Sequence, residues 1–467
     1  MKENLTRINY NRKLKLLLIK LGHFLLSIAL FYVAWIRFRY HGSLPISDVG
    51  FRYNYFITIA YAIIVFFFYK TYNAYLIGYW RVRSLVFAQF LSQFFSVVAV
   101  YFIVSIAWNH FDNPVVFIMV LVVQFLLDVA WSLFGNWFYY YLIPPKRTLL
   151  IYRNALDRKR FGSIVGKPNE RLYQITHELQ YDGTFHDLEE NLQGFEAIFV
   201  AGVNSRCRNG ILKYCKEHNV RGFFLPHVGD VIMQEAVHIQ SFDSPVLCVN
   251  RKVLNPEYAI VKRSLDFVSS LIGIIILSPF LLLTAIAIKL YDGGPAIYKQ
   301  VRLTKDSREF EIYKFRSMRV DAEKDGVARL STGDNDDRIT PIGRFIRKCR
   351  LDELPQLFNI LKGDMSLVGP RPERPEIAEQ YYKTMTDFKL RLQVKAGLTG
   401  YAQIYGKYNT DPYEKLEFDL MYINNMNIMT DLELIFATFF ILFSSESTAG
   451  VDAGAVTAMD YDSDNKA

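Results

Sequence analysis

The chain has 467 residues, of which 51% are hydrophobic and 15% aromatic, and its mean hydropathy is +0.10. This composition excludes a single small soluble domain and favours a membrane protein of several domains. The formal net charge is +8, but no basic stripe with interleaved aromatic residues is present, so we expect no nucleic-acid partner. Membrane lipids with anionic headgroups explain the positive excess better.

The N-terminal third, residues 1–145, contains four apolar segments close to the roughly 20 residues that cross a bilayer. They are residues 16–36, 55–69, 85–108 and 114–142. Basic residues precede the first segment, separate the second from the third and follow the fourth, which predicts a four-helix transmembrane bundle with cytoplasmic ends. Asp128 lies inside the fourth segment, where an acid is either functional or a packing partner; we favour packing because Gln124 and Trp131 are near.

Residues 146–261 have the pattern of a cytoplasmic Rossmann-like α/β domain. Apolar runs at 148–152, 197–201, 222–225 and 245–249 alternate with helical stretches such as 209–218, which predicts a parallel sheet. The turn after the first strand, residues 152–156, contains no glycine, so a backbone there cannot approach a pyrophosphate closely. We therefore expect a structural or regulatory domain rather than a nucleotide site.

The apolar segment 267–290 is long enough to cross the bilayer, and two topologies are open. A fifth span would carry the rest of the chain outside the cell. A re-entrant helix kinked at Ser278-Pro279 would return it to the cytoplasm, and the basic residues that flank both ends favour this alternative. Residues 432–443 are too short to span and are expected in the membrane interface, with a core helix as the alternative. Residues 444–467 are expected to form a disordered tail.

Asp352 and Glu353 stand just before an apolar helical pattern that has Pro355 in its first turn, which predicts a helix start. A helix N-terminus suits an acid that must stay ionised or meet phosphate. The alternative is that Asp352 only caps the helix. Nearby arginines at 347, 350 and 371 argue against that alternative, because a cap does not need them.

Several further motifs occur in a fixed order around this acidic pair. They are Lys262-Arg-Ser-Leu-Asp266, Gly294-Pro295, Gln300-Val-Arg302, Lys314-Phe-Arg-Ser-Met318, Asp337-Arg-Ile-Thr340, Gly363-Asp-Met-Ser366, Gly369-Pro-Arg-Pro372, Gly397-Leu-Thr-Gly400 and Asp419-Leu-Met-Tyr422. Together they resemble the bacterial polyprenyl-phosphate hexose-1-phosphate transferases, the long form of the monotopic phosphoglycosyl transferase superfamily. The resemblance covers residues 262–443, the expected mostly α catalytic domain. The chain departs from the family at Thr304 and Ser307, where glycines are usual.

The resemblance implies an enzyme of the bacterial inner membrane that acts at its cytoplasmic face. It would transfer a hexose-1-phosphate from a UDP-sugar to undecaprenyl phosphate and release UMP. The motifs do not distinguish glucose from galactose, and we favour glucose only because it is the commoner sugar. Capsule, exopolysaccharide or O-antigen synthesis would begin with this step. A scaffold that has lost catalysis and a hydrolase that uses water are the alternatives, and a homo-oligomer is left open.

The resemblance also implies roles for individual residues. Asp352 would be the nucleophile of a covalent phosphosugar-aspartyl intermediate, and Glu353 a metal ligand or general base. Both acids would hold Mg²⁺, the cofactor that hard oxygen ligands beside phosphate favour. Basic side chains suited to phosphate are Lys314, Arg347 and Arg371, followed by the weaker candidates Arg316, Arg302 and the neighbouring Gln300.

Overall fold

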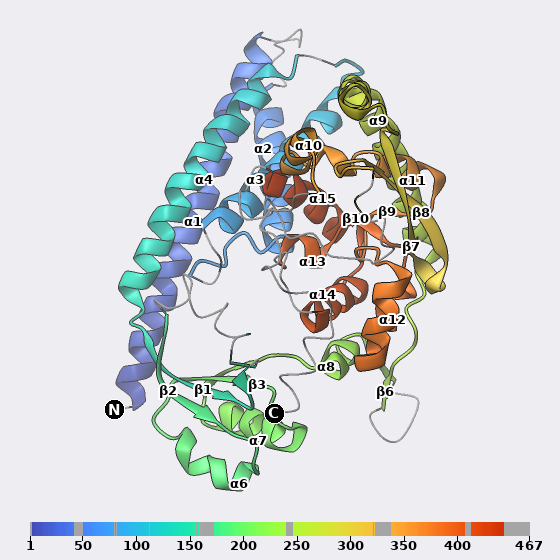
Figure 1. Cartoon of the computed structure of the whole chain (residues 1–467). Helices are drawn as coiled ribbons and strands as arrows, with labels where there is room; N and C mark the ends of the chain where they lie inside the picture. Colours follow the sequence, from blue (N-terminus) through green and yellow to red (C-terminus); the bar gives the residue numbers. More distant parts are fainter. Residues whose placement is uncertain are drawn as a thin grey trace. The chain divides into compact units, whose positions relative to one another are not determined.

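The structure is a computed structural model (Figure 1). It describes residues 2–41, 50–78, 80, 82–111, 113–155, 157–158, 160, 172–239, 246–320, 322, 338–406 and 412–442. The chain divides into two compact units, Met1–Leu225 and Pro226–Ala467, which are described separately. The expected tail at 444–467 lies outside the described residues.

The first unit begins with four long helices, α1 Lys2–His41, α2 Gly50–Thr71, α3 Val82–Ala107 and α4 Val115–Leu142. Each predicted apolar segment forms most of one helix, so these helices are confirmed. Contacts join α1 to α2, α2 to α3, α3 to α4 and α4 back to α1. Together with α9, described below, they make five helices in the described residues that are long and apolar enough to cross a membrane, as is typical of a membrane protein.

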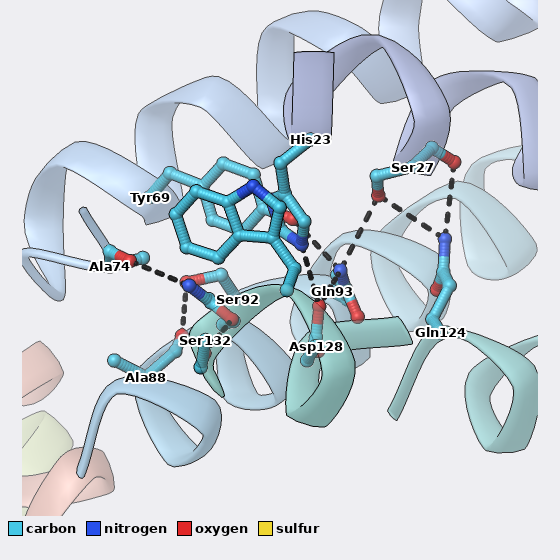
Figure 2. Close-up of polar contacts among 12 residues, drawn as sticks. His23, Ser27, Tyr69, Ala74, Ala88, Ser92, Gln93, Gln124, Asp128 and Ser132 are labelled. Carbon is cyan, nitrogen blue, oxygen red and sulfur yellow. Dashed lines mark hydrogen bonds and ion pairs between the residues drawn. The ribbon is translucent and has the colours of Figure 1, made fainter. Parts of the chain in front are cut away.

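A buried polar network ties these four helices together (Figure 2). One oxygen of Asp128 on α4 accepts hydrogen bonds from His23 Nε2 of α1 at 2.9 Å and from Gln93 Nε2 of α3 at 3.0 Å. The same Gln93 amide donates to the Tyr69 hydroxyl of α2 at 2.8 Å. All four side chains are almost completely buried. The network gives Asp128 the packing role that its sequence context favours.

The rest of the first unit is a four-stranded parallel sheet in the order β2-β1-β3-β4, as the sequence predicts. Its strands are β1 Lys146–Tyr152, β2 Tyr173–Gln180, β3 Ala197–Ala201 and β4 Arg221–Phe224, with α7 Ser205–Glu217 between the last two. The prediction that 245–249 adds a strand to this sheet is wrong. Val246–Cys248 (β6) pairs antiparallel with Val237–Ile239 (β5) in the second unit. Its side chains are largely exposed, unlike those of a strand buried in a parallel sheet.

The second unit is mostly helical, and its elements follow in chain order. They are α8 Val228–Met233, α9 Pro256–Asp292, the antiparallel hairpin β7 Ile297–Leu303 and β8 Glu309–Phe315, α10 Pro341–Lys348, the 3₁₀ turn η5 Leu351–Glu353, α11 Gln356–Lys362, β9 Ser366–Val368, α12 Pro375–Thr384, the 3₁₀ segment η6 Thr386–Gln393, β10 Gly397–Thr399, α13 Tyr401–Ile404, α14 Pro412–Asn424 and α15 Ile428–Leu442. Strands β9 and β10 pair in parallel.

One hydrophobic core joins these elements. Ile360 of α11, Leu416 of α14 and Leu434 of α15 are completely buried in it. Because Leu434 belongs to this core, the face of α15 that carries Leu434 is packed as a core helix, which was the alternative prediction for residues 432–443. Val228 and Val231 of α8 belong to the same core, so residues that the sequence assigns to the Rossmann-like domain pack in the second unit.

Helix α9 continues through Pro279 as one element. Pro279 has no amide hydrogen to donate to the carbonyl of Ile275, and the Ser278 hydroxyl donates to that oxygen at 2.8 Å. The serine hydroxyl thus satisfies the carbonyl that the proline leaves without its usual donor. Both ends of α9 are held by the second unit: Lys262 pairs with Asp431 of α15 at 2.8 Å, and Asp292 pairs with Arg316.

Candidate active site

The acidic pair lies on a single 3₁₀ turn between α10 and α11. Helix α11 begins at Gln356 and Pro355 is its N-cap residue, so both acids precede the helix. Neither acid makes a side-chain capping hydrogen bond at these helix starts, and the capping interpretation of Asp352 is wrong. Arg350, just before the turn, has a left-handed backbone with φ of 56°, a conformation uncommon for a residue with a side chain. This sharp bend directs the chain from α10 into the acidic turn.

Glu353 is surrounded by cations. Its Oε1 accepts from Arg371 Nη2 at 2.9 Å and from Lys314 Nζ at 3.3 Å, and its Oε2 lies 3.7 Å from Arg350 Nη1. Burial raises the pKa of Glu353, but the three cations outweigh it and hold that pKa well below its usual range. Glu353 is therefore a fixed negative charge at neutral pH.

Asp352 has different surroundings although it is the adjacent residue. It is half-buried, and within the described part of the chain no group hydrogen-bonds or pairs with its carboxylate. Burial, with the neighbouring charge of Glu353, raises the pKa of Asp352 to about 6. Environments that push two adjacent carboxylates apart in pKa are typical of catalytic pairs with divided roles. An unpartnered carboxylate beside several cations is suited to attack an electrophilic phosphorus.

The loop Gly369-Pro-Arg-Pro372 carries Arg371 to the acidic pair, and a close backbone contact positions it. A Cβ on Gly397 of β10 would lie 2.1 Å from the Gly369 nitrogen, so both motifs need glycine where they meet. Two arginines then hold the loop carbonyls. Arg391 donates to the Arg371 carbonyl at 2.7 Å, and Arg302 donates to the Pro372 carbonyl at 3.1 Å.

The predicted phosphate-binding residues have four different settings, and three of them lie close to the acidic pair or its loop. Lys314 and Arg371 contact Glu353 of the acidic pair directly. Arg347 donates to the Ser317 hydroxyl at 2.8 Å, and its charge acts on Asp352. Arg302 binds Gln300 Oε1 at 2.7 Å as well as the loop, and burial lowers its pKa to about 10.

Arg316 has a different setting from the other candidates. It is buried and pairs with Asp292 at the end of α9. A Cβ on Gly294 would lie 2.2 Å from its guanidinium, so Gly294 leaves space for this side chain. Its contacts anchor the end of α9 and do not include the acidic pair.

Two residues of the first motif support the site from α9. Arg263 donates to the Ile360 and Leu361 carbonyls at 2.7 and 2.8 Å, at the end of α11. Asp266 accepts from the Leu367 amide at 2.9 Å. These bonds fix α11 and β9, the elements that follow the acidic turn and precede the Arg371 loop.

Sequence reasoning did not single out Arg391, Glu373 or Lys415, which surround the Arg371 loop. Arg391 pairs with Asp419 of α14 at 2.7 Å and with Glu373 at 3.5 Å. Asp419 lies in one of the ordered motifs, and a buried acid in a motif predicts a cationic partner. That signal alone does not say which of the chain's many arginines is the partner.

The residues at the acidic turn also suit a magnesium ion. No group of three or more His, Cys, Asp or Glu side chains gathers as a metal cage within the described residues. Mg²⁺ commonly uses only one or two carboxylates together with substrate phosphates. Asp352 and Glu353 supply such oxygens, and the Asp352 oxygens have no protein partner among the described residues.

Fold and site define a membrane-associated protein with a carboxylate pair set among cations. The family model for the bacterial sugar transferases matches residues 257–445. A Bacillus subtilis relative, provisionally named an undecaprenyl-phosphate N-acetylgalactosaminyl 1-phosphate transferase, is 48% identical over 136 residues, which are 29% of this chain and 75% of that protein. The chain therefore belongs to the bacterial sugar transferase family.

Two longer relatives match the same region. The UDP-N-acetylgalactosamine-undecaprenyl-phosphate N-acetylgalactosaminephosphotransferase of Aeromonas hydrophila is 42% identical over 187 residues, 39% of this chain and 44% of that protein. The UDP-glucose:undecaprenyl-phosphate glucose-1-phosphate transferase of Klebsiella pneumoniae is 42% identical over 211 residues, 44% of this chain and 43% of that protein. The match thus spans less than half the length of these two relatives.

Proposed function

We propose that this protein transfers a sugar-1-phosphate from a UDP-sugar to undecaprenyl phosphate, and so begins the synthesis of a bacterial polysaccharide. The observation that carries the proposal is the difference in surroundings between the two adjacent acids. Glu353 is occupied by Lys314 and Arg371, whereas Asp352 has no partner in the described structure and lies beside the same cations. Relatives whose names describe transfer to undecaprenyl phosphate support the substrate class.

The chemistry requires two displacements at one phosphorus. A carboxylate oxygen of Asp352 attacks the sugar-bearing phosphorus of the donor, and the bond to the bridging oxygen breaks, so UMP leaves with that oxygen. A phosphate oxygen of the lipid then attacks the same phosphorus and releases the Asp352 carboxylate. Lys314 and Arg371 neutralise charge on the phosphoryl oxygens during both steps. Mg²⁺, when held by Asp352, Glu353 and substrate phosphates, would screen the diphosphate from the attacking anion.

We further propose that α9 enters and leaves the membrane on the cytoplasmic side of the inner membrane. Its N-terminal half is tied to α11, β9 and Asp431, and its C-terminal half packs Ile288 against Phe315 and Ile346. A straight spanning helix would separate these contacts across the bilayer, whereas all of them belong to one compact unit. This arrangement leaves the acidic pair beside the membrane on the side that contains nucleotide sugars.

The test uses purified full-length protein and donors labelled in the sugar. UDP-glucose, UDP-galactose and UDP-N-acetylgalactosamine are compared, because the relatives' names include these sugars. Without lipid acceptor, the wild type should release about one equivalent of UMP and retain the label on the protein. Asp352→Asn should do neither, and the control Asp387→Asn, at an exposed site, should behave as wild type. Label retained by Asp352→Asn, or kinetics that demand a ternary complex, would assign the nucleophile elsewhere.

A further inference from the structure

Lys415 on α14 is a half-buried cation with no partner in the described part of the chain. Within the described residues its ammonium makes no hydrogen bond or ion pair. It lies one helical turn before Asp419, and residues four apart share one face of a helix. Its three N–H donors are therefore available to an anion that enters the site.

Both acids near Lys415 are already engaged by arginines. Asp419 lies 2.7 Å from Arg391, and Glu373 lies 3.5 Å from Arg391 and 4.0 Å from Arg302. The side chains of Asp419 and Arg391 are only 1% and 3% exposed, so this pairing is fixed within the core. Lys415 is the positive charge that remains after these acids are paired.

Arg391 connects the acids beside Lys415 to the transfer site. Arg391, the partner of Asp419, donates to the carbonyl of Arg371, and the Arg371 guanidinium reaches Glu353. Burial and the charges of Arg391 and Arg371 lower the pKa of Lys415, while Glu373 and Asp419 act in the opposite direction. Burial and like charge both favour binding of an anion between these cations.

We infer that Lys415 binds the nucleoside-side phosphate of the donor, the group that leaves as the nucleoside monophosphate. The inference rests on the proposed function. A diphosphate donor brings a second phosphate next to the phosphorus under attack, and negative charge grows on it as the bond breaks. Lys314 and Arg371 serve the attacked phosphorus, and Lys415 serves the leaving phosphate from the α14 side of Arg371. A lysine suits this place because it binds phosphate as a point charge.

The experiment measures ligand affinity by calorimetry on full-length protein in lipid nanodiscs. Lys415→Met is compared with Lys415→Arg, which keeps the charge, and with Lys383→Met, which removes an exposed lysine from the end of α12. The probes are UMP, UDP and uridine. Lys415→Met should weaken UMP and UDP by about tenfold or more, the loss expected for one hydrogen bond to a charged group. Uridine should bind as before, because it has no phosphate.

Two further results complete the test. Lys415→Arg should recover most of the affinity, and Lys383→Met should bind all three probes as wild type does. Wild-type affinity of Lys415→Met for UMP and UDP would overturn the inference alone, provided that Asp352→Asn still blocks UMP release. If the wild type binds no nucleotide and transfers no sugar-phosphate, the proposed function fails and the inference fails with it. An equal loss for uridine would also overturn it, because it would indicate a general disturbance of the site.

Discussion

At the scale of single residues, the different surroundings of Asp352 and Glu353 predict a particular pH dependence. Asp352 must be ionised to attack, and its pKa is raised to about 6, so the ionised fraction falls as the pH drops through 6. We expect kcat/KM for the donor to fall about tenfold per pH unit below that value. Glu353→Gln removes the like charge and should move this acidic limb to lower pH while reducing the maximal rate. Rate profiles from pH 4 to 8 measure both, and a wild-type limb near pH 4 would contradict the assignment.

The two positions that depart from the family's glycines should respond to glycine in opposite ways. Ser307 has a left-handed φ of 60°, which glycine adopts without strain. Ser307→Gly should therefore raise the free energy of unfolding by about 0.5–1 kcal/mol, once the greater entropy of glycine in the unfolded chain is subtracted. Thr304 is extended and buried, accepts from the Ala396 amide and donates to the Asp364 carbonyl. Thr304→Gly should therefore destabilise by about 1–3 kcal/mol. Thermal unfolding in detergent measures both, and shifts of the same sign would contradict the explanation.

The position of a residue beside the acidic pair could be predicted where a motif and its chemistry coincide. Lys314 and Arg371 were identified from the sequence because phosphate chemistry needs cations near the acids, and both contact Glu353. The partner of Arg316 could not be predicted in this way. Its partner Asp292 stands at the far end of α9, and only the folded path of that helix brings the two side chains together.

At the scale of elements, the proline of α9 should determine membrane topology. Replacing Ser278-Pro279 by Leu-Leu restores a backbone hydrogen bond and removes a polar group, which favours a straight spanning helix. A cysteine placed at the exposed Lys299, with the exposed Cys349 changed to serine, should be labelled from outside the cell only when Leu-Leu is present. Outside labelling with the natural Ser278-Pro279 would contradict the re-entrant helix and the cytoplasmic site.

Elements could be predicted when their own residues determine them, and could not when a distant partner does. Apolar helices such as α4 are specified by composition over many consecutive residues, and the predicted 114–142 nearly coincides with Val115–Leu142. Strand β6 is short, and its pairing depends on which partner lies beside it. Val246–Cys248 meets β5 rather than the parallel sheet, and nothing in the local pattern distinguishes the two partners.

At the scale of the whole molecule, the second unit should work without the first, and α8 should contribute to its stability. Val231 of α8 is completely buried in the core of this unit, and its carbonyl accepts from Asn424 of α14. A chain that starts at Pro226 should fold and keep activity. A chain that starts at Pro256 loses two buried valines, worth about 3 kcal/mol together, and should unfold at a lower temperature. Equal melting temperatures for the two chains would contradict this role of α8.

Hydropathy did not separate α8 from the parallel sheet that precedes it. The sequence places the start of the catalytic domain at 262, whereas the second compact unit starts at Pro226. A short helix such as Val228–Met233 has too few residues for composition to decide which neighbouring core it joins.

The network of Asp128 and His23 has a consequence for biogenesis. These partners are 105 residues apart in the chain, so the ribosome makes α4 roughly 5–20 s after α1. During that delay α1 presents a polar imidazole to the membrane without its acceptor, an arrangement that lipid disfavours. We therefore expect α1, α2 and α3 to stay near the insertion machinery, or only loosely associated with one another, until α4 has been inserted. Only then does the bundle close, so its assembly is completed by its last helix.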